Sequence, residues 1–459
     1  MLSIKIEGKL RAVLPDGLIT ERDIEFDEAR KIWNAMIDRK PAAICRCHST
    51  IEVQQVLLTA LASGLAVTIK GGGHNIAGTA IADDALMLDL SPMKTIEVDV
   101  QNRLALVDGG VTWAEFDAAA QAHGLATPGG VVSSTGVAGL TLGGGFGWLA
   151  RKYGLAVDNL LFAEVVLANG HIVTASQSEH PDLFWALRGG GGNFGVVTRF
   201  GFRLHKIGPD VLFGPTFFAL EDAERVLSAY SLVAPQLPRE MCVWANLMTA
   251  PTTPALPPAM HGTKVLTLMQ FVGGNKYSSA ATHLEQLYGG ATPIGSGLAV
   301  RPYLQAQRFL DETYEHGARN YWRAHNHTAI STDLITTLVE LASELPTPGS
   351  ELLINHLGGA VSDVPTTETA FPHRQIPFMC TPGLRWTDPS KDDALIDWLH
   401  RSSERISAHS VPGKYVNFIT ETDNEAAHAY VGNLEKLVTV KRQYDPENVF
   451  ASNQNIIPA

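Results

Sequence analysis

The sequence predicts an α+β protein with two domains, and three observations indicate this fold class. The chain has 459 residues, 45% of them hydrophobic and 18% charged, which is enough for two domains or for one large domain with an insertion. Residues 42–205 alternate short apolar runs with helical patterns. Near residue 207 prolines enter the sequence, and residues 209 to about 410 mix strand-like runs with helices. That mixture is typical of an antiparallel sheet with helices on one face.

Short strands and glycine-terminated helices account for the first region. The strand-like runs, bounded by glycine, aspartate or proline, are "AAICRC", "LAVTIKGGG", "DALMLDL", "TIEVDV" and "RLALVDGG". Two segments, "TIEVQQVLLTALASG" and "TWAEFDAAAQAHG", repeat apolar residues at helical spacing, and each ends at a glycine. We expect Thr50 and Thr112 to be their N-caps, the second with Glu115 in a capping box. "NLLFAEVVLANGHIVTAS" predicts a β-hairpin whose two-residue turn is Asn169-Gly170.

The second region and the end of the chain have a different pattern of strands and helices. Strands such as "KVLTLMQFVG" and "ELLINHLGGAV" alternate with helices such as "DLITTLVELASEL" and "KDDALIDWLHRSSERI". After residue 410 one helix, "EAAHAYVGNLEKLVTVKRQY", precedes the tail "DPENVFASNQNIIPA". We expect Phe450, Ile456 and Ile457 of this tail to be buried, because they are large and apolar.

Composition excludes several classes of function. The formal net charge is -12 and the pI is about 5.7, so we expect no nucleic-acid or membrane partner. The start of the chain lacks the apolar core of a secretory signal, and no run approaches the roughly 18 apolar residues of a membrane span. The cysteines Cys45, Cys47, Cys242 and Cys380 are too scattered for a disulfide framework or a zinc site. We therefore expect free thiols and a cytoplasmic location.

Three glycine clusters carry the chemistry of the first domain. They are "KGGGHN" (70–75), "TPGGVVSSTGVAGLTLGGGFG" (127–147) and "RGGGGNFGVVT" (188–198). Glycine permits close backbone approach, and successive amide N–H groups form an anion-binding concavity. Each run alone is also consistent with a structural turn. Three runs in one domain predict that they line the binding site of a long anionic ligand. The Rossmann and Walker motifs are absent, so a dinucleotide here requires a different flavin fold.

Long motifs in the right order give the chain a family resemblance. They include "GGGHN" (71–75), "STGVAGLTLGGGFGWLARKYGLAVDNL" (134–160), "PDLFWALRGGGGNFGVVT" (181–198), "LGGAVSDVPTTETAFPHR" (357–374) and "KRQYDPENVFASNQNI" (441–456). The chain resembles the vanillyl-alcohol-oxidase-type flavoproteins, in the berberine-bridge-enzyme-like branch. The resemblance implies a two-subdomain FAD-binding domain of the PCMH type, formed by residues 1–208 (core about 37–207) and completed by 411–459. Residues 209–410 would form an inserted substrate-binding domain with an antiparallel sheet.

The resemblance also implies where the flavin is held. The imidazole of the "GGGHN" motif, His74 here, would bond covalently to the 8α-methyl group of FAD. Many relatives add a second link from a cysteine, at a position that matches Val132 here, and no cysteine lies between Cys47 and Cys242. We therefore expect FAD attached through His74 only. The residues expected to contact the cofactor are Lys70, Gly71, Gly72, Gly73, His74, Asn75, Gly78, Pro128, Gly129, Gly130, Ser134, Thr135, Gly136, Gly139, Leu140, Gly144, Gly145, Phe146, Gly147, Asn193, Gly195, Val197, Asn453 and Asn455.

The base of the family's alcohol oxidases is missing from this sequence. Those relatives use the last tyrosine of a Y-x-N-Y segment, and this chain reads Tyr415-Val416-Asn417-Phe418. Phenylalanine cannot accept a proton, so either another residue serves or the substrate needs no base, as for an amine that loses hydride with help from its own lone pair. The candidates for catalytic roles are Tyr415, Asn417, Tyr153 and His356. A core aromatic and a core histidine are the alternative interpretations of Tyr415 and His356.

The sequence thus predicts an FAD-linked oxidase acting on a small organic alcohol, amine or phenolic compound, with dioxygen as the second substrate. A dehydrogenase of the same fold and a flavin-binding protein without turnover are the alternatives. No histidine-rich segment has a carboxylate at metal-ligand spacing, and G-x-S-x-G is absent, so we expect neither a metal nor a serine nucleophile. We expect a monomer or a homodimer.

Overall fold

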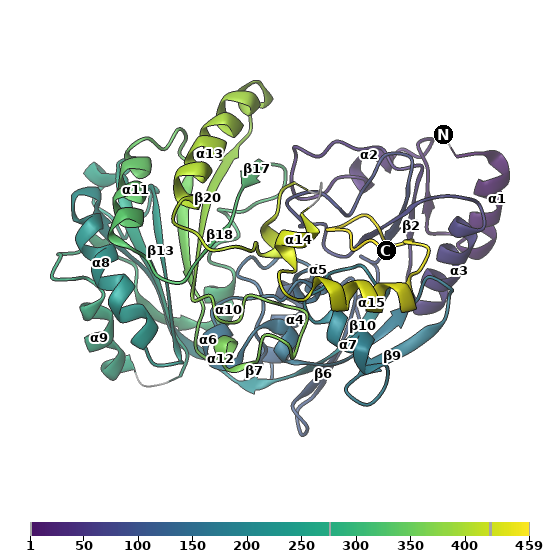
Figure 1. Ribbon diagram of the computed structural model, residues 1–459, viewed down its shortest axis with the longest axis horizontal. Helices are drawn as coiled ribbons and strands as arrows, with labels where there is room; N and C mark the ends of the chain where they lie inside the picture. The colour runs from purple at the N-terminus through teal and green to yellow at the C-terminus, as the bar shows by residue number, and fades with distance from the viewer. Residues whose placement is uncertain (1, 275–276, 422–424, 459) are drawn as a thin grey trace.

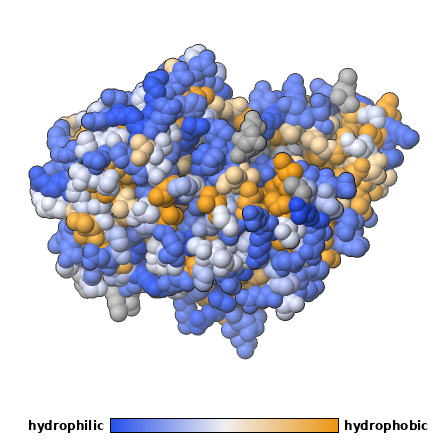
Figure 2. Space-filling model, viewed as in Figure 1, coloured by the Kyte–Doolittle hydropathy of each residue, from blue (hydrophilic) through white to orange (hydrophobic). Residues whose placement is uncertain are grey.

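The protein has two lobes that face each other, and the end of the chain returns to the first lobe (Figure 1). The computed structural model describes residues 2–274, 277–421 and 425–458. In the described residues no helix is both long and apolar enough to cross a membrane. The face of the molecule in Figure 2 is mostly hydrophilic, with apolar side chains in small scattered groups.

A small, mostly parallel sheet forms the outer part of the first lobe. Its strands, in spatial order, are β1 (Leu18–Ile19), β2 (Ala43–Arg46), β4 (Leu86–Asp89) and β3 (Val67–Lys70), and only β1 is antiparallel to its neighbour. Helix α3 (Thr50–Leu61) makes the crossover between β2 and β3 and buries its apolar stripe with α1 (Ile4–Val13), while the short α2 (Phe26–Ala29) lies near β1. Ser49 caps α3 by accepting from the Glu52 amide, so the prediction of Thr50 as the cap was wrong by one residue.

A five-stranded antiparallel sheet forms the inner part of the first lobe. Its order is β5 (Ile96–Asp99), β6 (Leu104–Asp108), β10 (Val196–Arg203), β8 (Leu160–Val166) and β9 (Ile172–Ser176). The hairpin predicted around Asn169-Gly170 is confirmed by the β8–β9 pairing, with Gly170 at φ +82°. Helix α4 (Trp113–Gln121) has the predicted capping box of Thr112 and Glu115. The other elements here are α5 (Val137–Leu142), α6 (Ala150–Tyr153), α7 (Pro181–Leu187) and the pair β7 (Leu125–Ala126) and β11 (His205–Lys206).

The second lobe is one nine-stranded antiparallel sheet with helices on one face, which confirms the predicted class. Its main path is β15 (Gly295–Ser296), β12 (Asp210–Ala219), β14 (Lys264–Val272), β13 (Met241–Thr249), β19 (Glu351–His356), β20 (Phe378–Trp386) and β17 (Arg319–Trp322), while β16 (Ala299–Pro302) pairs with β12 and β18 (His325–His327) with β20. Helices α8 (Ala223–Val233), α9 (Tyr277–Gln286), α11 (Thr332–Ser343) and α13 (Asp392–Ser407) cover the outer face (Figure 1). The short α10 (Tyr303–Gln307) and α12 (Ala360–Asp363) lie toward the first lobe.

The last segment packs back onto the first lobe. The single helix predicted after residue 424 is two helices, α14 (Ala426–Ala429) and α15 (Leu434–Tyr444), because Gly432 between them has φ +79°. α15 packs against α7 (Figure 1). The expected burial of Phe450 and Ile456 is confirmed at 1% and 0% exposure, whereas Ile457 is 63% exposed.

A buried carboxyl group lies between the lobes, where α4 packs against α10. Asp117 is 3% exposed, and its Oδ2 accepts a hydrogen bond from Gln307 Nε2 at 2.9 Å. The same Gln307 nitrogen donates to the carbonyl of Gly130 at 3.2 Å. Burial raises the pKa of Asp117 to about 7, although the hydrogen bond and Arg308 act in the opposite direction. The folded protein therefore keeps a proton on this group that the unfolded chain releases near pH 4.

Replacing Asp117 with asparagine is expected to stabilise the protein at high pH. Because the folded-state pKa is raised, this group favours the folded state fully below pH 4, and that contribution falls as the pH rises to about 7. The difference between the pKa of 3.8 in the unfolded chain and about 7 in the folded protein corresponds to about 4 kcal/mol of unfolding free energy. An asparagine oxygen still accepts from Gln307, so Asp117→Asn should raise the melting temperature at pH 8 and leave it unchanged near pH 4. The matched control is Asp397→Asn, an exposed site on α13, and an Asp117→Asn protein with the wild-type pH dependence would contradict this prediction.

Candidate active site

One cavity of about 830 Å³ lies between the glycine turns of the first lobe and the sheet of the second. Its volume is within the range of cofactor and ligand pockets. The chain reaches it from three directions: the loops after β3 and β7, the inner face of the nine-stranded sheet, and the C-terminal tail. The cavity is therefore built by residues that are far apart in the sequence.

Two of the predicted glycine turns meet at the cavity wall through their backbones. A Cβ on Gly72 would lie 2.3 Å from the Gly136 nitrogen, and one on Gly136 would lie 2.4 Å from the Gly72 nitrogen. Cβ atoms at Gly139 and Gly192 would meet nothing within 4 Å, and both residues line the cavity. Glycine at Gly72 and Gly136 thus permits the two turns to touch, whereas at Gly139 and Gly192 it leaves room for a ligand.

Gly72→Ala is expected to separate the two turns. Because the new methyl group would collide with backbone rather than with a flexible side chain, we expect a loss of about 1–3 kcal/mol and a weakened hold on any ligand of the cavity. Thermal unfolding and the flavin-to-protein absorbance ratio measure the two effects. Gly8→Ala in α1 is the matched control, since its Cβ meets nothing within 4 Å. Wild-type stability together with wild-type flavin content in Gly72→Ala would contradict the prediction.

Most of the predicted cofactor contacts line the cavity, but not all. Those on its wall are Gly71, Gly72, Gly73, His74, Asn75, Gly130, Thr135, Gly136, Gly139, Leu140, Phe146, Gly195, Val197 and Asn453. The predicted contacts that do not line it are Lys70, Gly78, Pro128, Gly129, Ser134, Gly144, Gly145, Gly147, Asn193 and Asn455. Asn193, for example, is 0% exposed and holds the tail by accepting from the Ile456 amide at 3.0 Å.

His74 lies on the wall between aromatic neighbours. Its Nε2 is 2.8 Å from the hydroxyl oxygen of Ser134, and its ring stacks on Trp33 with a centroid distance of 5.1 Å. The His316 ring meets it edge-on, also at 5.1 Å. Burial, with a smaller contribution from His316, lowers the pKa of His74 to about 3. The imidazole is therefore neutral at ordinary pH and keeps a nitrogen lone pair.

No cysteine of the chain lies on the cavity wall. Val132, at the position where many relatives have the second flavin link, does line it. The four cysteines are buried elsewhere, and burial raises the pKa of Cys45, Cys242 and Cys380 to about 12. His74, in contrast, lies on this wall with an imidazole nitrogen that can act as a nucleophile.

The tail carries amide groups into the glycine-lined part of the cavity. Asn453 and Gln454 line it, and Asn453 Oδ1, Gln454 Oε1 and Asn455 Oδ1 are buried without a hydrogen-bond partner. Unsatisfied buried acceptors are costly, so their presence beside a cavity indicates a ligand with hydrogen-bond donors. Together with the space at Gly139 and Gly192, these atoms fit a group such as FAD, which has donors and a long polar chain.

Tyr415, Asn417 and Phe418 stand together in the short helical turn Val416–Phe418 and its flank, and all three line the cavity. The Tyr415 hydroxyl oxygen accepts from the Gly145 amide at 3.1 Å and from Asn417 Nδ2 at 2.9 Å. Burial raises the pKa of Tyr415 to about 12, although these two hydrogen bonds lower it. Tyr415 is therefore protonated at neutral pH, where it can donate a hydrogen bond but is not a base.

Tyr153 and His356 do not reach the cavity wall. Tyr153 stacks on His205 at a centroid distance of 3.9 Å. His356 is 1% exposed, lies 3.0 Å from an Arg151 nitrogen, and packs against Phe378 on the helix-covered face of the sheet. His356 is turned away because side chains alternate between the two faces of a strand, and the cavity side of β19 belongs to Glu351, Leu353 and Asn355. Tyr153 ends helix α6. The structure thus does not bring these two candidates to the cavity.

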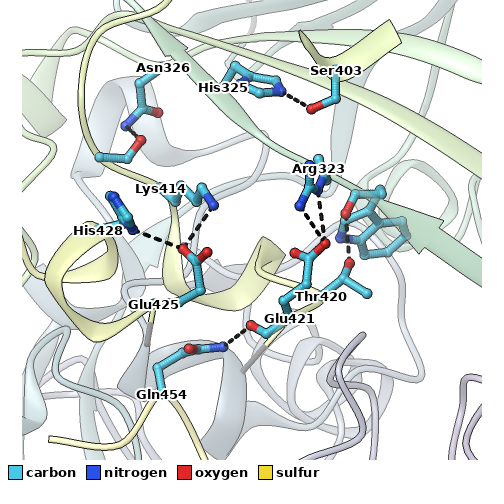
Figure 3. A network of polar contacts seen from close by, with 12 residues as sticks. Arg323, His325, Asn326, Ser403, Lys414, Thr420, Glu421, Glu425, His428 and Gln454 are labelled. Atoms are coloured by element: carbon cyan, nitrogen blue, oxygen red, sulfur yellow. Dashed lines mark hydrogen bonds and ion pairs between the residues drawn. The ribbon is translucent and has the colours of Figure 1, made fainter. Parts of the chain in front are cut away.

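Ion pairs connect the tail segment to the second lobe near the cavity (Figure 3). Glu421 accepts from Arg323 at 2.8 Å and from the Tyr321 hydroxyl at 2.6 Å. Glu425 pairs with Lys414 at 2.8 Å and with His428 at 3.2 Å. The Glu421 contacts join β17 and the loop after it to the residues that follow Phe418, whereas the Glu425 contacts lie within the C-terminal segment on both sides of the turn that carries Tyr415.

The sequence interpretation missed the sheet side of the cavity. Alternate residues of five strands line it: Pro215 and Phe217 of β12; Trp244, Asn246 and Met248 of β13; Thr267 and Met269 of β14; Glu351, Leu353 and Asn355 of β19; Thr381 and Gly383 of β20. Trp33, Tyr314 and Trp322 were missed as well. The two-residue period of "ELLINH" was a signal for two faces, but it did not say which face meets a cavity. Among the described residues no cluster of His, Cys, Asp and Glu could hold a metal ion.

Known proteins are similar to this chain along nearly its whole length. The family model "FAD binding domain" matches residues 41–176, and "Berberine and berberine like" matches residues 414–457. An FAD-linked oxidoreductase of Bacillus subtilis is 29% identical over 97% of both chains, and the (R)-6-hydroxynicotine oxidase of Paenarthrobacter nicotinovorans is 28% identical over 99% of this chain and 98% of its own. The crystal structure of 6-hydroxy-D-nicotine oxidase from Arthrobacter nicotinovorans superposes with a TM-score of 0.85 at 25% identity, covering 97% of this chain and 98% of that one. The chain is therefore an FAD-linked oxidoreductase by its similarity to these relatives, and its residues 41–176 and 414–457 match the FAD-binding and the berberine-like family models.

Proposed function

We propose that this enzyme is an oxidase that takes a hydride from a small organic alcohol, amine or phenolic compound and passes the two electrons to dioxygen, giving hydrogen peroxide. The observation that carries the proposal is that one cavity joins the glycine turns and His74 to the inner face of the second lobe's sheet. FAD, when bound, supplies the redox chemistry by accepting the hydride and reducing dioxygen. The protein binds the cofactor and orients the substrate toward it.

The tether is proposed to be His74 alone. Burial lowers its pKa to about 3, so the imidazole is neutral near pH 7 and a ring nitrogen is available for a bond to the flavin. Val132 offers no second nucleophile. The turn formed by Gly72 and Gly136, together with the tail amides of Asn453 and Gln454, would hold the rest of the cofactor.

The reacting end of the cavity is proposed to work without a protein base. Phe418 lies on the wall at the base position of the family's alcohol oxidases, and its ring meets those of Phe146 and Trp322 at 5.7 and 5.5 Å. Tyr415 is protonated, since its pKa is about 12. This environment favours a substrate whose own lone pair assists hydride loss, and Tyr415 would orient it by donating a hydrogen bond.

The domain division is part of the proposal. Residues 1–208 and 411–459 would bind FAD, and residues 209–410 would bind the substrate. Two observations support it: the tail lines the cavity beside the glycine turns, and every strand of the nine-stranded sheet lies between Asp210 and Trp386.

Anaerobic mixing tests the function directly. The purified yellow protein is mixed with panels of amines, alcohols, phenols and sugars, and bleaching of the flavin absorbance reports hydride transfer. Air is then admitted: rapid return of colour with one hydrogen peroxide per flavin supports an oxidase. Slow return with air but fast return with an artificial electron acceptor would indicate the dehydrogenase instead. A flavin that no panel bleaches would contradict the proposal.

A further inference from the structure

One carboxylate stands on the sheet side of the cavity. Glu351 begins β19, whose residues Glu351, Leu353 and Asn355 all line the cavity. Its Oε1 accepts from the Tyr314 hydroxyl at 2.6 Å, and its Oε2 accepts from Asn246 Nδ2 at 2.7 Å. Both oxygens act as acceptors, which is the hydrogen-bond pattern of an ionised carboxylate. Each oxygen retains a further lone pair for a ligand.

No cation within the described ranges pairs with this carboxylate at 4.0 Å or less. Arg385 lies nearby but stacks over the Tyr314 ring at 4.2 Å and donates to Asn320 Oδ1 at 3.2 Å. The other charged side chains on the wall, Arg308 and Glu312, are exposed. A partly buried carboxylate held by two neutral donors keeps its negative charge available to a cation that enters the cavity.

The same sheet face has polar atoms that no protein group satisfies. Asn355 is 1% exposed, and both its Nδ2 and its Oδ1 lack a partner. Other buried atoms without partners on this face are Trp244 Nε1, Asn246 Oδ1, Thr267 Oγ1 and Thr381 Oγ1. Each such atom is costly unless a ligand or water satisfies it, so their concentration on one face indicates a polar ligand there. Glu351 and Asn355 are roughly 13 Å apart along the strand.

Aromatic side chains separate this polar face from the turn of Tyr415. Trp244 lies beside Asn355 across the β13–β19 pairing, and its ring meets Phe146 at 5.8 Å. Phe146 in turn meets Tyr415 at 5.2 Å. The reacting end and the carboxylate are thus at different ends of one aromatic-lined cavity.

We propose that Glu351 is a cation-recognition residue, so that the enzyme's substrate has a protonated nitrogen held by this carboxylate and, nearer Tyr415, a reacting carbon beside a second, unprotonated nitrogen or oxygen whose lone pair assists hydride loss. The proposal rests on the proposed function, and it narrows the alcohol, amine or phenolic class to cationic compounds. The Tyr314 hydroxyl fixes the carboxylate: burial and Glu351 itself raise the pKa of Tyr314 well above its usual range, so this hydroxyl remains a donor. Glu351 positions the substrate and takes no part in hydride transfer.

The test compares a matched pair of probes on wild-type and Glu351→Gln proteins. 2-Phenylethylamine is a cation at pH 7.5, and 2-phenylethanol is its neutral counterpart of the same shape. Binding is measured anaerobically in the yellow holoenzyme by perturbation of the oxidised flavin spectrum and by quenching of tryptophan fluorescence. We expect the wild type to bind the amine about 10- to 100-fold more tightly than the alcohol, and Glu351→Gln to lose that preference while binding the alcohol unchanged. The control is Glu344→Gln, an exposed glutamate after α11.

Each outcome decides the inference. If the wild type shows no preference for the amine, or if Glu351→Gln keeps it, the inference is wrong, and flavin bleaching by any substrate panel still supports the proposed oxidase. If Glu351→Gln weakens the amine and the alcohol equally and lowers the melting temperature, Glu351 only anchors the Tyr314 loop and the inference is again wrong. A preserved amine preference in a protein whose flavin no substrate bleaches would support cation recognition and contradict the oxidase.

Discussion

The His74→Ala protein is expected to give a colourless pellet after acid precipitation, with all of its flavin in the supernatant. The wild-type pellet is expected to stay yellow, because a covalent bond survives denaturation whereas noncovalent contacts do not. We expect a complete rather than a partial loss, because the proposed link is single and none of the four cysteines, all of them described, lines the cavity. Absorbance near 450 nm of the redissolved pellet, with mass spectrometry of the intact chain, measures it.

The control for this experiment is His316→Ala. His316 meets the His74 ring edge-on at 5.1 Å, so its removal disturbs the same neighbourhood without removing the proposed nucleophile. Its pellet should stay yellow. A colourless wild-type pellet, or a yellow His74→Ala pellet, would contradict attachment through this residue.

Lys441→Met is expected to cost about 3–5 kcal/mol of stability, since it leaves a buried carboxylate without its partner. Lys441 and Asp445 are both 0% exposed, and their Nζ–Oδ2 distance is 2.6 Å. The same ammonium group donates to the carbonyls of Asn193 at 2.8 Å and Phe450 at 3.1 Å. It therefore joins α15, the third glycine cluster and the tail that carries Asn453 to the cavity.

Two measurements test the prediction for Lys441→Met. The free energy of unfolding should fall in a denaturant titration, and limited proteolysis should cut the C-terminal tail earlier than in the wild type. Arg442→Met is the matched control, because Arg442 is the exposed neighbour of Lys441 on the same helix. Equal stability of the two variants would show that the buried pair does not hold the tail.

Residue types and their neighbours along the chain made much of the fold predictable, together with the glycine-turn side of the candidate site. Several glycines close together indicate tight turns or close backbone approach, so the turns of Gly72 and Gly136 could be recognised from residue type and spacing alone. The hairpin at Asn169-Gly170 and the capping box at Thr112 depend on neighbouring residues, and both are confirmed. The helix expected after residue 424 was wrong because Gly432 interrupts it, and helical spacing alone does not locate such a break.

The sheet side of the cavity could not be predicted in the same way. Glu351 meets Tyr314 and Asn246, which are 37 and 105 residues away along the chain. His356 was a reasonable candidate by residue type, yet it lies on the opposite face of the same strand, packed against Phe378. A two-residue period tells that a strand has two faces, and only the packing of helices on one of them decides which face is left for a ligand.

By itself the sequence determined the identity of the chemical groups: the glycines that let two backbones touch, the histidine at the end of their turn, and the phenylalanine where relatives have a base. These depend on residue type and on neighbours along the chain. The tertiary structure alone decided their protonation and their partners: that Tyr415 keeps its proton, that Lys441 and Asp445 form a fully buried pair, and that Glu351 lines the cavity with no cation of the described residues paired to it. Burial and long-range contact set pKa values and pairing, and both arise only when distant segments pack against each other.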